Sequence, residues 1–385
     1  GIHVVTGSLD GQAIVWNVET GQRHLTVSDP PPPPTLRGLL ENLIDKARGV
    51  VSVAFSPDGG QILTANLDKT LKTWDTRIGQ SNQVLQGHRD MVSCAAFSAD
   101  GQQMVSGSYD QTLIVWDTRT RKKIHLLEGH DGPVKSVAFS PDGRWIVSGS
   151  GNDSQKIEGR RNQVLVVWDA RSGEQVRTLK GHDAAVSSVA FSPAGDLIAS
   201  GSWDKTVKIW DALTGKEIRT LAGHNQKVTA IAFHPTRKEL ASGSEDRFVR
   251  TWNLETGEVL HKLGHIDDVK CLAYSADGQK IASGSAFDTA HVWDSRSGQP
   301  ILTLKAHADY VTGVSFSPDG NRLATISRDA TLKVWNIEFG VELLRLKGYG
   351  GAIKSVTFSP DGRQIVTGHN DYTLKIWGHL LEGKS

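Results

Sequence analysis

Serine, histidine and aspartate recur together in this sequence at spacings that could suggest a hydrolase. His182, Ser200 and Asp204 form one such trio, and in a catalytic triad these residue types supply the base, the nucleophile and the orienting acid. The same three residue types recur at the same spacing in His224, Ser242 and Asp246. An enzyme needs one such site, whereas a repeated structural unit needs its motif in every copy. We therefore predict a structural role for the trios and no catalytic residues.

Two weaker motifs point to phosphate and metal chemistry. The segment 378–385, GHLLEGKS, matches the phosphate-loop pattern, but such a loop needs a helix directly after its lysine and the sequence ends at Ser385. The two cysteines, Cys94 and Cys271, have no zinc-like spacing to histidines and occupy equivalent positions in distant repeats. We expect no metal, no disulfide, no cofactor and no small-molecule substrate.

Composition narrows the class of partner. The 43 basic and 42 acidic residues leave a net charge of +1, so no global field would attract nucleic acid or an acidic membrane. No stretch approaches the roughly 20 apolar residues that span a bilayer, and residues 1–20 lack a secretion signal. Few cysteines are typical of a reducing compartment. We predict a soluble intracellular protein, in the cytoplasm, without nucleic-acid or membrane partners.

An internal repeat must position these residues. Tryptophan recurs about every 42 residues along most of the chain. Each period holds three short runs of Val, Ile, Ala, Phe and Trp, separated by turn formers such as Ser-Pro-Asp-Gly. A fourth run, such as Glu217–Leu221, lies between each tryptophan and the next Gly-His. Four strands per period describe one blade of a β-propeller.

The repeated text resembles the WD-repeat family over nearly the whole chain. The name-giving Trp-Asp pair stands at Trp74–Asp75, Trp116–Asp117, Trp168–Asp169, Trp210–Asp211 and Trp293–Asp294. The resemblance implies an all-β, closed propeller of four-stranded antiparallel blades. It also implies a buried hydrogen-bond chain in each blade, from the Trp indole to a Ser or Thr, to the Gly-His histidine, to an Asp. The complete structural tetrads are His88, Ser106, Asp110, Trp116; His182, Ser200, Asp204, Trp210; His224, Ser242, Asp246, Trp252; and His307, Thr325, Asp329, Trp335.

Some blades depart from this pattern. Lys46 and Tyr349 stand where the resemblance implies histidines, and Phe287 takes an aspartate position with Asp288 one residue late. In the blade of His130 the aspartate is ambiguous, because about ten extra residues lie between two strands. We expect these blades to be held less rigidly.

Two irregular segments interrupt the period. The insertion at 151–163 is polar and charged, which predicts a solvent loop with a protease-sensitive tip. Its Ile157–Arg160 stretch resembles an engineered cleavage sequence, although a natural loop is the preferred interpretation. In segment 28–49, five consecutive prolines favour polyproline II, and apolar residues at helical spacing over 36–47 predict a short amphipathic helix. This helix would dock on the propeller edge, bind a partner, or join two propellers.

The strand inventory predicts the domain organisation. Residues 1–27 supply about three strands of a partial N-terminal blade, 28–49 the proline-rich segment and helix, 50–377 the blades, and 378–385 a tail. We predict one closed ring, most simply of eight blades, in which the strand near Gln22–Val27 joins the three C-terminal strands. Seven blades, or a segment of a longer repeat array, are the alternatives.

The resemblance also implies a partner-binding face, here called the top face. It places three positions per blade there: the residues flanking the inner-strand valine after Gly-His, and the residue before the turn aspartate. These positions hold Met91, Ser93, Tyr109, Ala185, Ser187, Trp203, Lys227, Thr229, Glu245, Asp268, Lys270, Phe287, Tyr310, Thr312, Arg328, Lys354 and Asn370. Tyr, Trp and Arg most often carry interface energy, so we predict Tyr109, Trp203, Tyr310 and Arg328 as anchors. The remaining members of the predicted partner-binding set are Met91, Glu245, Lys227 and Lys270.

These observations predict a non-catalytic protein-protein interaction scaffold or recognition module that binds a protein or peptide on the top face. The mixed signs of the top-face charges favour such a partner over a polyanion. One alternative is a sensor or regulatory propeller of a larger multidomain signalling protein. Another is a propeller enzyme, a hydrolase or lyase with its site at the central channel. That enzyme would need a cluster of unpaired His, Asp or Glu on the top loops of one blade, and the sequence shows scattered charges only.

Overall fold

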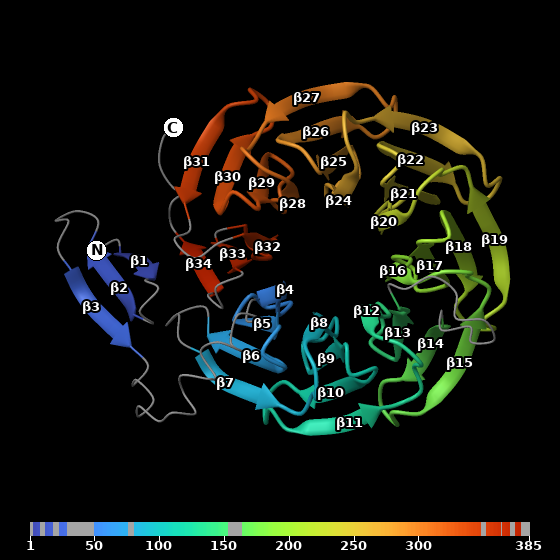
Figure 1. The fold of residues 1–385 in the computed structure, drawn as a ribbon, viewed down its shortest axis with the longest axis horizontal. Helices are drawn as coiled ribbons and strands as arrows, with labels where there is room; N and C mark the ends of the chain where they lie inside the picture. The colour runs from blue at the N-terminus through green and yellow to red at the C-terminus, as the bar shows by residue number, and fades with distance from the viewer. Residues whose placement is uncertain are drawn as a thin grey trace.

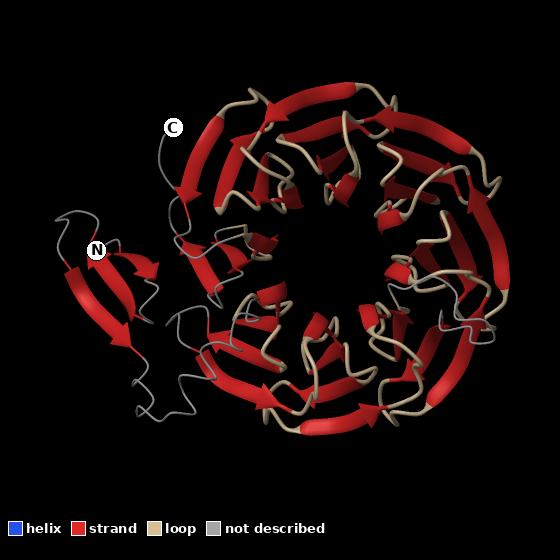
Figure 2. Cartoon of the chain, viewed as in Figure 1, coloured by secondary structure: helices blue, strands red, loops and turns tan. Residues whose placement is uncertain are grey.

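The computed structural model describes residues 3–7, 12–17, 23–28, 50–75, 81–152, 164–347, 352–362, 364–369 and 374–378. Within these ranges the strands form seven four-stranded antiparallel sheets and two three-stranded ones. Each four-stranded sheet is one blade, and its strands follow chain order from the central channel outward (Figures 1 and 2). The all-β propeller predicted from the repeat is therefore confirmed.

Strands at the same place in each blade have closely similar bounds. The inner strands are β4 (Val50–Phe55), β8 (Val92–Phe97), β12 (Val134–Phe139), β16 (Val186–Phe191), β20 (Val228–Phe233), β24 (Val269–Tyr274), β28 (Val311–Phe316) and β32 (Ile353–Phe358). The second strands are β5 (Gln61–Asn66), β9 (Gln103–Ser108), β13 (Trp145–Ser150), β17 (Leu197–Ser202), β21 (Glu239–Ser244), β25 (Lys280–Ser285), β29 (Arg322–Ser327) and β33 (Gln364–His369). The third strands are β6 (Thr70–Asp75), β10 (Leu113–Asp117), β14 (Val164–Asp169), β18 (Thr206–Asp211), β22 (Phe248–Asn253), β26 (Thr289–Asp294), β30 (Thr331–Asn336) and β34 (Leu374–Gly378). The outer strands are β7 (Ser81–Gln86), β11 (Lys123–Leu127), β15 (Gln175–Lys180), β19 (Glu217–Ala222), β23 (Val259–Gly264), β27 (Pro300–Lys305) and β31 (Glu342–Lys347).

The core lies in layers between successive blades. In β17 and β21 every residue after the first is buried, because the second strand packs against a neighbouring blade on each face. Outer strands alternate instead, so that Leu221 of β19 is buried while Ile218 is 48% exposed. One of the layers packs Val105 of β9 against Ile146 of β13 in the following blade. Each blade therefore depends on its neighbours for burial of its apolar face.

Hydroxyl groups on the inner strands join successive blades. The Ser187 hydroxyl donates to the carbonyl of Val228 in the next blade at 2.7 Å. The backbone amide of Val53 donates to Ser355 Oγ at 3.2 Å, which joins β4 to β32. Like Ser187, three other hydroxyl residues donate to a carbonyl of the next blade: Ser93 to Val134, Thr229 to Val269 and Thr312 to Ile353. The inner strands are thus tied side by side around the channel.

The first three strands do not complete the last sheet. β1 (His3–Gly7), β2 (Gln12–Asn17) and β3 (Arg23–Ser28) pair with one another outside the ring, and β32–β34 remains three-stranded in the described residues (Figure 1). The prediction that the strand near Gln22–Val27 pairs with the C-terminal strands is therefore wrong. Only five residues separate β2 from β3 in the sequence, so their pairing costs far less loop-closure entropy than pairing across nearly the whole chain.

Other predicted segments lie outside the described residues. The amphipathic helix expected within 35–48 is one of them, as are the insertion core at 153–163 and the tail from 379 onward. The described residues contain no helix, and hence none long and apolar enough to cross a membrane.

The turn between the second and third strands forces a side chain into a conformation that favours glycine. Ala330 has a φ of 66°, and Lys69, Gln111, Lys205 and Arg247 share this left-handed conformation at equivalent positions. An L-residue there costs about 1 kcal/mol. We expect Ala330→Gly to raise the free energy of unfolding by about 0.5 kcal/mol, the strain relief less the greater chain entropy of glycine. Ala324→Gly, in the buried part of β29, should lower it in the same urea titration, and stabilisation by both or by neither would contradict the strain argument.

Candidate protein-binding face

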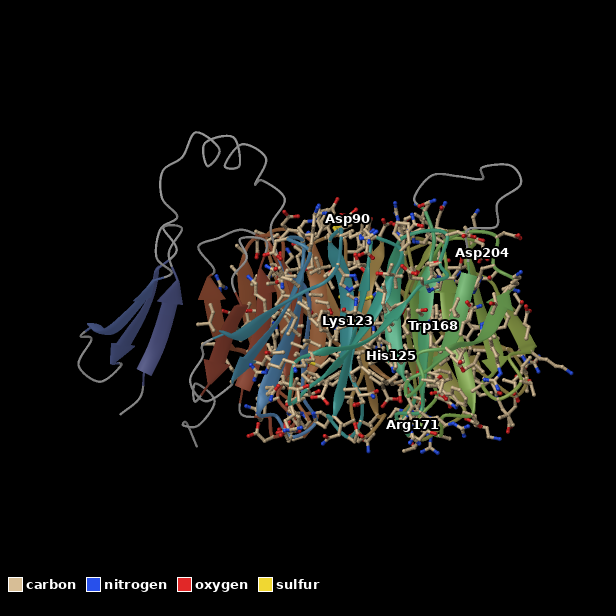
Figure 3. All side chains as sticks on the ribbon, turned by 90° about the horizontal axis from the view of Figure 1, so that it is seen from below. Asp90, Lys123, His125, Trp168, Arg171 and Asp204 are labelled. Atoms are coloured by element: carbon tan, nitrogen blue, oxygen red, sulfur yellow. The ribbon has the colours of Figure 1, made fainter. Side chains whose placement is uncertain are left out.

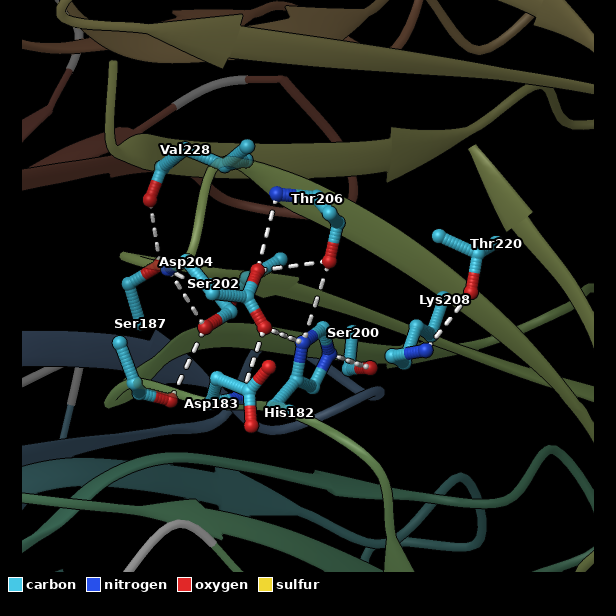
Figure 4. Close-up of polar contacts among 12 residues, drawn as sticks. His182, Asp183, Ser187, Ser200, Ser202, Asp204, Thr206, Lys208, Thr220 and Val228 are labelled. Atoms are coloured by element: carbon cyan, nitrogen blue, oxygen red, sulfur yellow. Dashed lines mark hydrogen bonds and ion pairs between the residues drawn. The ribbon is translucent and has the colours of Figure 1, made fainter. Parts of the chain in front are cut away.

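A buried hydrogen-bond chain fixes the top of the β16–β19 blade (Figure 4). Trp210 Nε1 donates to Ser200 Oγ at 2.9 Å, and this hydroxyl lies 2.7 Å from His182 Nε2. His182 Nδ1 lies 2.7 Å from the Asp204 carboxylate. Because an indole N–H only donates and a carboxylate only accepts, the chain is satisfied by a neutral imidazole that donates from Nδ1 and accepts the serine proton at Nε2.

The same chain recurs in two further blades and changes in a third. In the β8–β11 blade His88 lies 3.0 Å from Asp110 and 2.8 Å from Ser106, which accepts from Trp116 at 3.0 Å. In the β20–β23 blade His224 lies 2.9 Å from Asp246 and 2.7 Å from Ser242, which accepts from Trp252 at 2.8 Å. In the β28–β31 blade Trp335 and His307 both bond Thr325, at 3.0 and 2.8 Å, but His307 Nδ1 is nearer to Thr331 Oγ1, at 2.7 Å, than to Asp329, at 3.3 Å. All four predicted sets are therefore brought together, the last with a threonine inserted.

The aspartates of these chains also tie two loops together. Asp204 accepts from the backbone amides of Asp183 and Thr206, and Asp246 accepts from that of Asn225. Burial opposes ionisation of Asp204, but the hydrogen bonds that its carboxylate accepts from His182, Thr206 and the amide of Asp183 outweigh burial and hold its pKa well below the usual range. The Ser-His-Asp trios are thus engaged in holding loops, and each serine hydroxyl is occupied by its own tryptophan.

Two blades lack the aspartate partner among the described residues. His130 bonds Ser148 at 2.7 Å, but its Nδ1 is buried without a partner, and burial lowers its pKa to about 4. His265 bonds Ser283 at 2.7 Å, its Nδ1 also lacks a partner, and its pKa falls to about 3 through burial and the nearby His291. These are the blades in which the sequence shows an insertion and Phe287, respectively.

The top face is the end of the ring that carries Asp90 and Asp204, opposite Arg171 (Figure 3). Predicted anchors on this face lie against cations from neighbouring blades. The Lys227 ammonium is 4.1 Å from the ring centre of Trp203, and the Lys135 ammonium is 4.9 Å from it and 5.3 Å from that of Tyr109. The stacking holds these side chains half-buried in a fixed arrangement.

The other predicted contacts form two further groups. Arg328 lies over the Tyr310 ring at 4.7 Å, and burial together with Arg328 lowers the pKa of Lys354. Lys270 makes ion pairs with Glu245 at 3.2 Å and with Asp268 at 3.1 Å. Met91 is half-buried beside Tyr109, whose amide donates to the Met91 carbonyl. Asn370 lies outside the described residues.

Some predicted top-face positions hold the ring together instead. Ser187 and Thr229, expected to face a partner, donate their hydroxyls to the next blade, as do Ser93 and Thr312. Ala185, also expected to be accessible, is only 1% exposed. A short hydroxyl side chain reaches the adjoining carbonyl, whereas lysine at the same strand position is long enough to reach the channel mouth. Ala185 is therefore too buried to face a partner, whereas a partner-facing role for the four half-buried hydroxyl residues stays a prediction.

Sequence reasoning missed Lys135. It occupies the inner-strand position that corresponds to Lys270 and follows Val134, so the same positional rule would have found it. No cluster of three or more His, Cys, Asp or Glu side chains suited to a metal ion occurs in the described part of the chain.

This architecture, strands in radial blades tied by Trp-Ser-His-Asp chains, defines a β-propeller of the WD type. The family of the WD domain, G-beta repeat, matches residues 40–75, 79–117, 121–157, 173–211, 215–253, 257–294, 298–336 and 340–378. The chain belongs to the WD-repeat family.

Named relatives share only parts of their length with this chain. It is 48% identical over 44 residues to the Periodic tryptophan protein 2 homolog of Schizosaccharomyces pombe, covering 11% of this chain and 5% of that protein. It is 37% identical over 95 residues to the human WD repeat and SOCS box-containing protein 1, covering 24% and 19%. A U3 snoRNP-associated protein-like YAOH from Oryza sativa is 29% identical over 97 residues, covering 23% and 18%. The crystal structure of the computationally designed Ika8 protein superposes with a TM-score of 0.76 at 29% identity, over 86% of this chain and 97% of that one.

Proposed function

We propose that this chain is a non-catalytic interaction scaffold that binds a protein or peptide on its top face. The observation that carries the proposal is the set of cation-stacked aromatic side chains on the top face. Tyr109, Trp203 and Tyr310 are each stacked with a Lys or Arg, so their orientation is set before a partner arrives. Aromatic and arginine side chains held in this way offer large contact area at small entropic cost.

The use of the Ser-His-Asp trios supports the non-catalytic part of the proposal. In the β16–β19 blade the Ser200 hydroxyl accepts from Trp210 and contacts His182, and all three side chains are buried. A nucleophile must reach substrate, and this one is enclosed by its own partners. The same arrangement recurs in other blades, as a fold-holding motif should.

We also propose that the propeller closes as a ring of eight blades. Eight matched repeats support this count, and the bond from Val53 to Ser355 supports closure between β4 and β32. An intracellular, cytoplasmic setting is part of the same proposal, because both Cys94 and Cys271 are free thiols. Nucleic acid and membranes are not proposed as partners, since the net charge is +1.

Truncation of two anchors tests the proposed face. Affinity capture with the intact chain, followed by mass spectrometry, supplies the partner. We expect Trp203→Ala and Tyr310→Ala each to weaken its binding by about 2 kcal/mol, roughly 30-fold, with an unchanged melting temperature. Phe339→Ala, an exposed aromatic in a turn of the opposite face, is the control. Unchanged affinity in both top-face variants would place the interface elsewhere.

A further inference from the structure

The most exposed apolar side chains of the top face gather on two neighbouring blades. Ile266 is 67% exposed, Phe287 53% and Tyr310 37%. The other exposed large hydrophobic residues in the described ranges belong to outer strands or to the turns that lead into them, such as Leu213 and Phe339. We call Ile266, Phe287 and Tyr310 the apolar patch.

The patch arises where the loop-tying aspartate is missing. In the β20–β23 blade Asp246 accepts from the backbone amide of Asn225 at 3.0 Å. Phe287 and Ile266 stand at the corresponding positions of the β24–β27 blade. An aspartate side chain that would turn inward to bond the loop is replaced there by a phenyl ring that faces solvent. The ring is 53% exposed, and exposed apolar side chains that gather on one surface are typical of an interaction site.

The loops of the two blades are joined, which places the patch residues on one surface. The amide of Val311, next to Tyr310, donates to the Phe287 carbonyl at 3.4 Å. The amides of Ala306 and His307 donate to the Asp288 carbonyl at 2.7 and 3.0 Å. The loop that bears Phe287 therefore lies against the start of the β28–β31 blade.

Carboxylates accompany each residue of the patch. Asp267 follows Ile266, Asp288 follows Phe287, and Asp309 precedes Tyr310; none of these carboxylates forms an ion pair with a described residue. Asp267 and Asp309 only accept from the backbone amide that follows each of them.

Two arrangements elsewhere on the top face set the patch apart. Asp268 is already paired with Lys270 at 3.1 Å, and the lysines at Trp203 give that part of the face the opposite sign. Arg328 lies over the Tyr310 ring at 4.7 Å, so the acidic character is greatest around Ile266 and Phe287.

We infer that the apolar patch and its three carboxylates bind a protein segment in which apolar side chains alternate with lysine or arginine. The apolar side chains would cover Ile266 and Phe287, and the basic groups would pair with the unpaired aspartates. An acidic segment would be repelled here. This inference rests on the proposed function of the top face and names the chemistry of its partner.

The test uses the full chain and two labelled peptides of identical length. One is fluorescein-Gly-Lys-Phe-Lys-Leu-Lys-Gly, and the other has glutamate in place of each lysine. Fluorescence polarisation should show at least about tenfold tighter binding of the lysine peptide, with an affinity that falls as salt is added. Equal binding of the two peptides would overturn the inference.

Variants assign the binding to the patch. Phe287→Ser should weaken the lysine peptide about tenfold, and Asp288→Asn, which keeps the backbone bonds of Asp288, should weaken it several-fold and reduce its salt dependence. Phe339→Ser, a comparably exposed phenyl on the opposite face, should have no effect. Equal losses in Phe287→Ser and Phe339→Ser would overturn the assignment. A captured partner that is released by Trp203→Ala but insensitive to both Phe287→Ser and Asp288→Asn would also overturn it, while leaving the proposed function intact.

Discussion

Acidification from pH 7 to pH 4 is expected to remove several kcal/mol from the free energy of unfolding of the propeller. Burial lowers the pKa of His130 and of His307 to about 4, against an ordinary value of 6.5. The unfolded chain therefore binds more protons than the folded one between these values. Stability is complete above about pH 6.5 and is lost as the pH falls toward 4, by about 3 kcal/mol for each of these histidines.

Urea unfolding at several pH values between 7.5 and 4.5 measures this loss. His130→Gln should be less stable than the parent at pH 7.5 but should lose less stability on acidification, because one protonating group is gone. Val147→Ala, a truncation of a buried residue in the same blade, is the matched control and should be less stable than the parent but keep its slope. A stability that stays level down to pH 4.5, or equal slopes for the two variants, would contradict the buried neutral histidines.

Asp204→Ala is expected to lower the free energy of unfolding by about 1–3 kcal/mol, the cost of buried polar groups left without partners. The carboxylate accepts from His182, from the hydroxyl and amide of Thr206 and from the amide of Asp183. Alanine would leave all of these donors unsatisfied at once. Thermal and urea unfolding measure the loss, and peptide binding at other blades should persist.

Asp183→Ala is the control for this experiment. It removes a carboxylate one residue from His182 but keeps the backbone amide that Asp204 accepts from, so it should change stability by less than about 0.5 kcal/mol. If Asp204→Ala melts like the parent, or if Asp183→Ala costs as much, the carboxylate does not hold the loops in the way described.

Features that repeat in every blade were predictable from the sequence. Trp210, Ser200 and His182 recur at fixed spacings because the same local geometry is rebuilt each time, and a residue type needed in every copy reveals its role by repetition. Departures from the repeat could also be predicted. Phe287 stands at a position that holds aspartate in other blades, which indicates that the hydrogen bond from aspartate to the loop is missing in this blade. The sequence could not predict how exposed the Phe287 side chain is, because exposure depends on the direction in which its phenyl ring points.

Relations between blades were predicted less well. Position alone does not tell whether Ser187 points toward solvent or toward the next blade, because both choices leave the strand pattern unchanged. The stacking of Lys135 on Trp203 joins residues 68 positions apart through the packing of two blades. The repeat pattern predicts that β3 is a strand but does not specify which sheet edge it pairs with, so the pairing of β3 with β2 was not predicted.

The residue that follows the first valine of an inner strand differs between blades, and two side-chain types recur there. A serine or threonine there, as in Ser187 or Thr229, is consumed in holding the next blade. Where lysine stands there, as in Lys135, the following residue joins the blades by a different bond, because the amide of Val189 donates to Ser136 Oγ at 3.1 Å. The bond between two blades can thus be made from either of two adjacent strand positions. An exchange of the residue pair at these positions would change the side chain at the top of one blade and keep a hydrogen bond to the next.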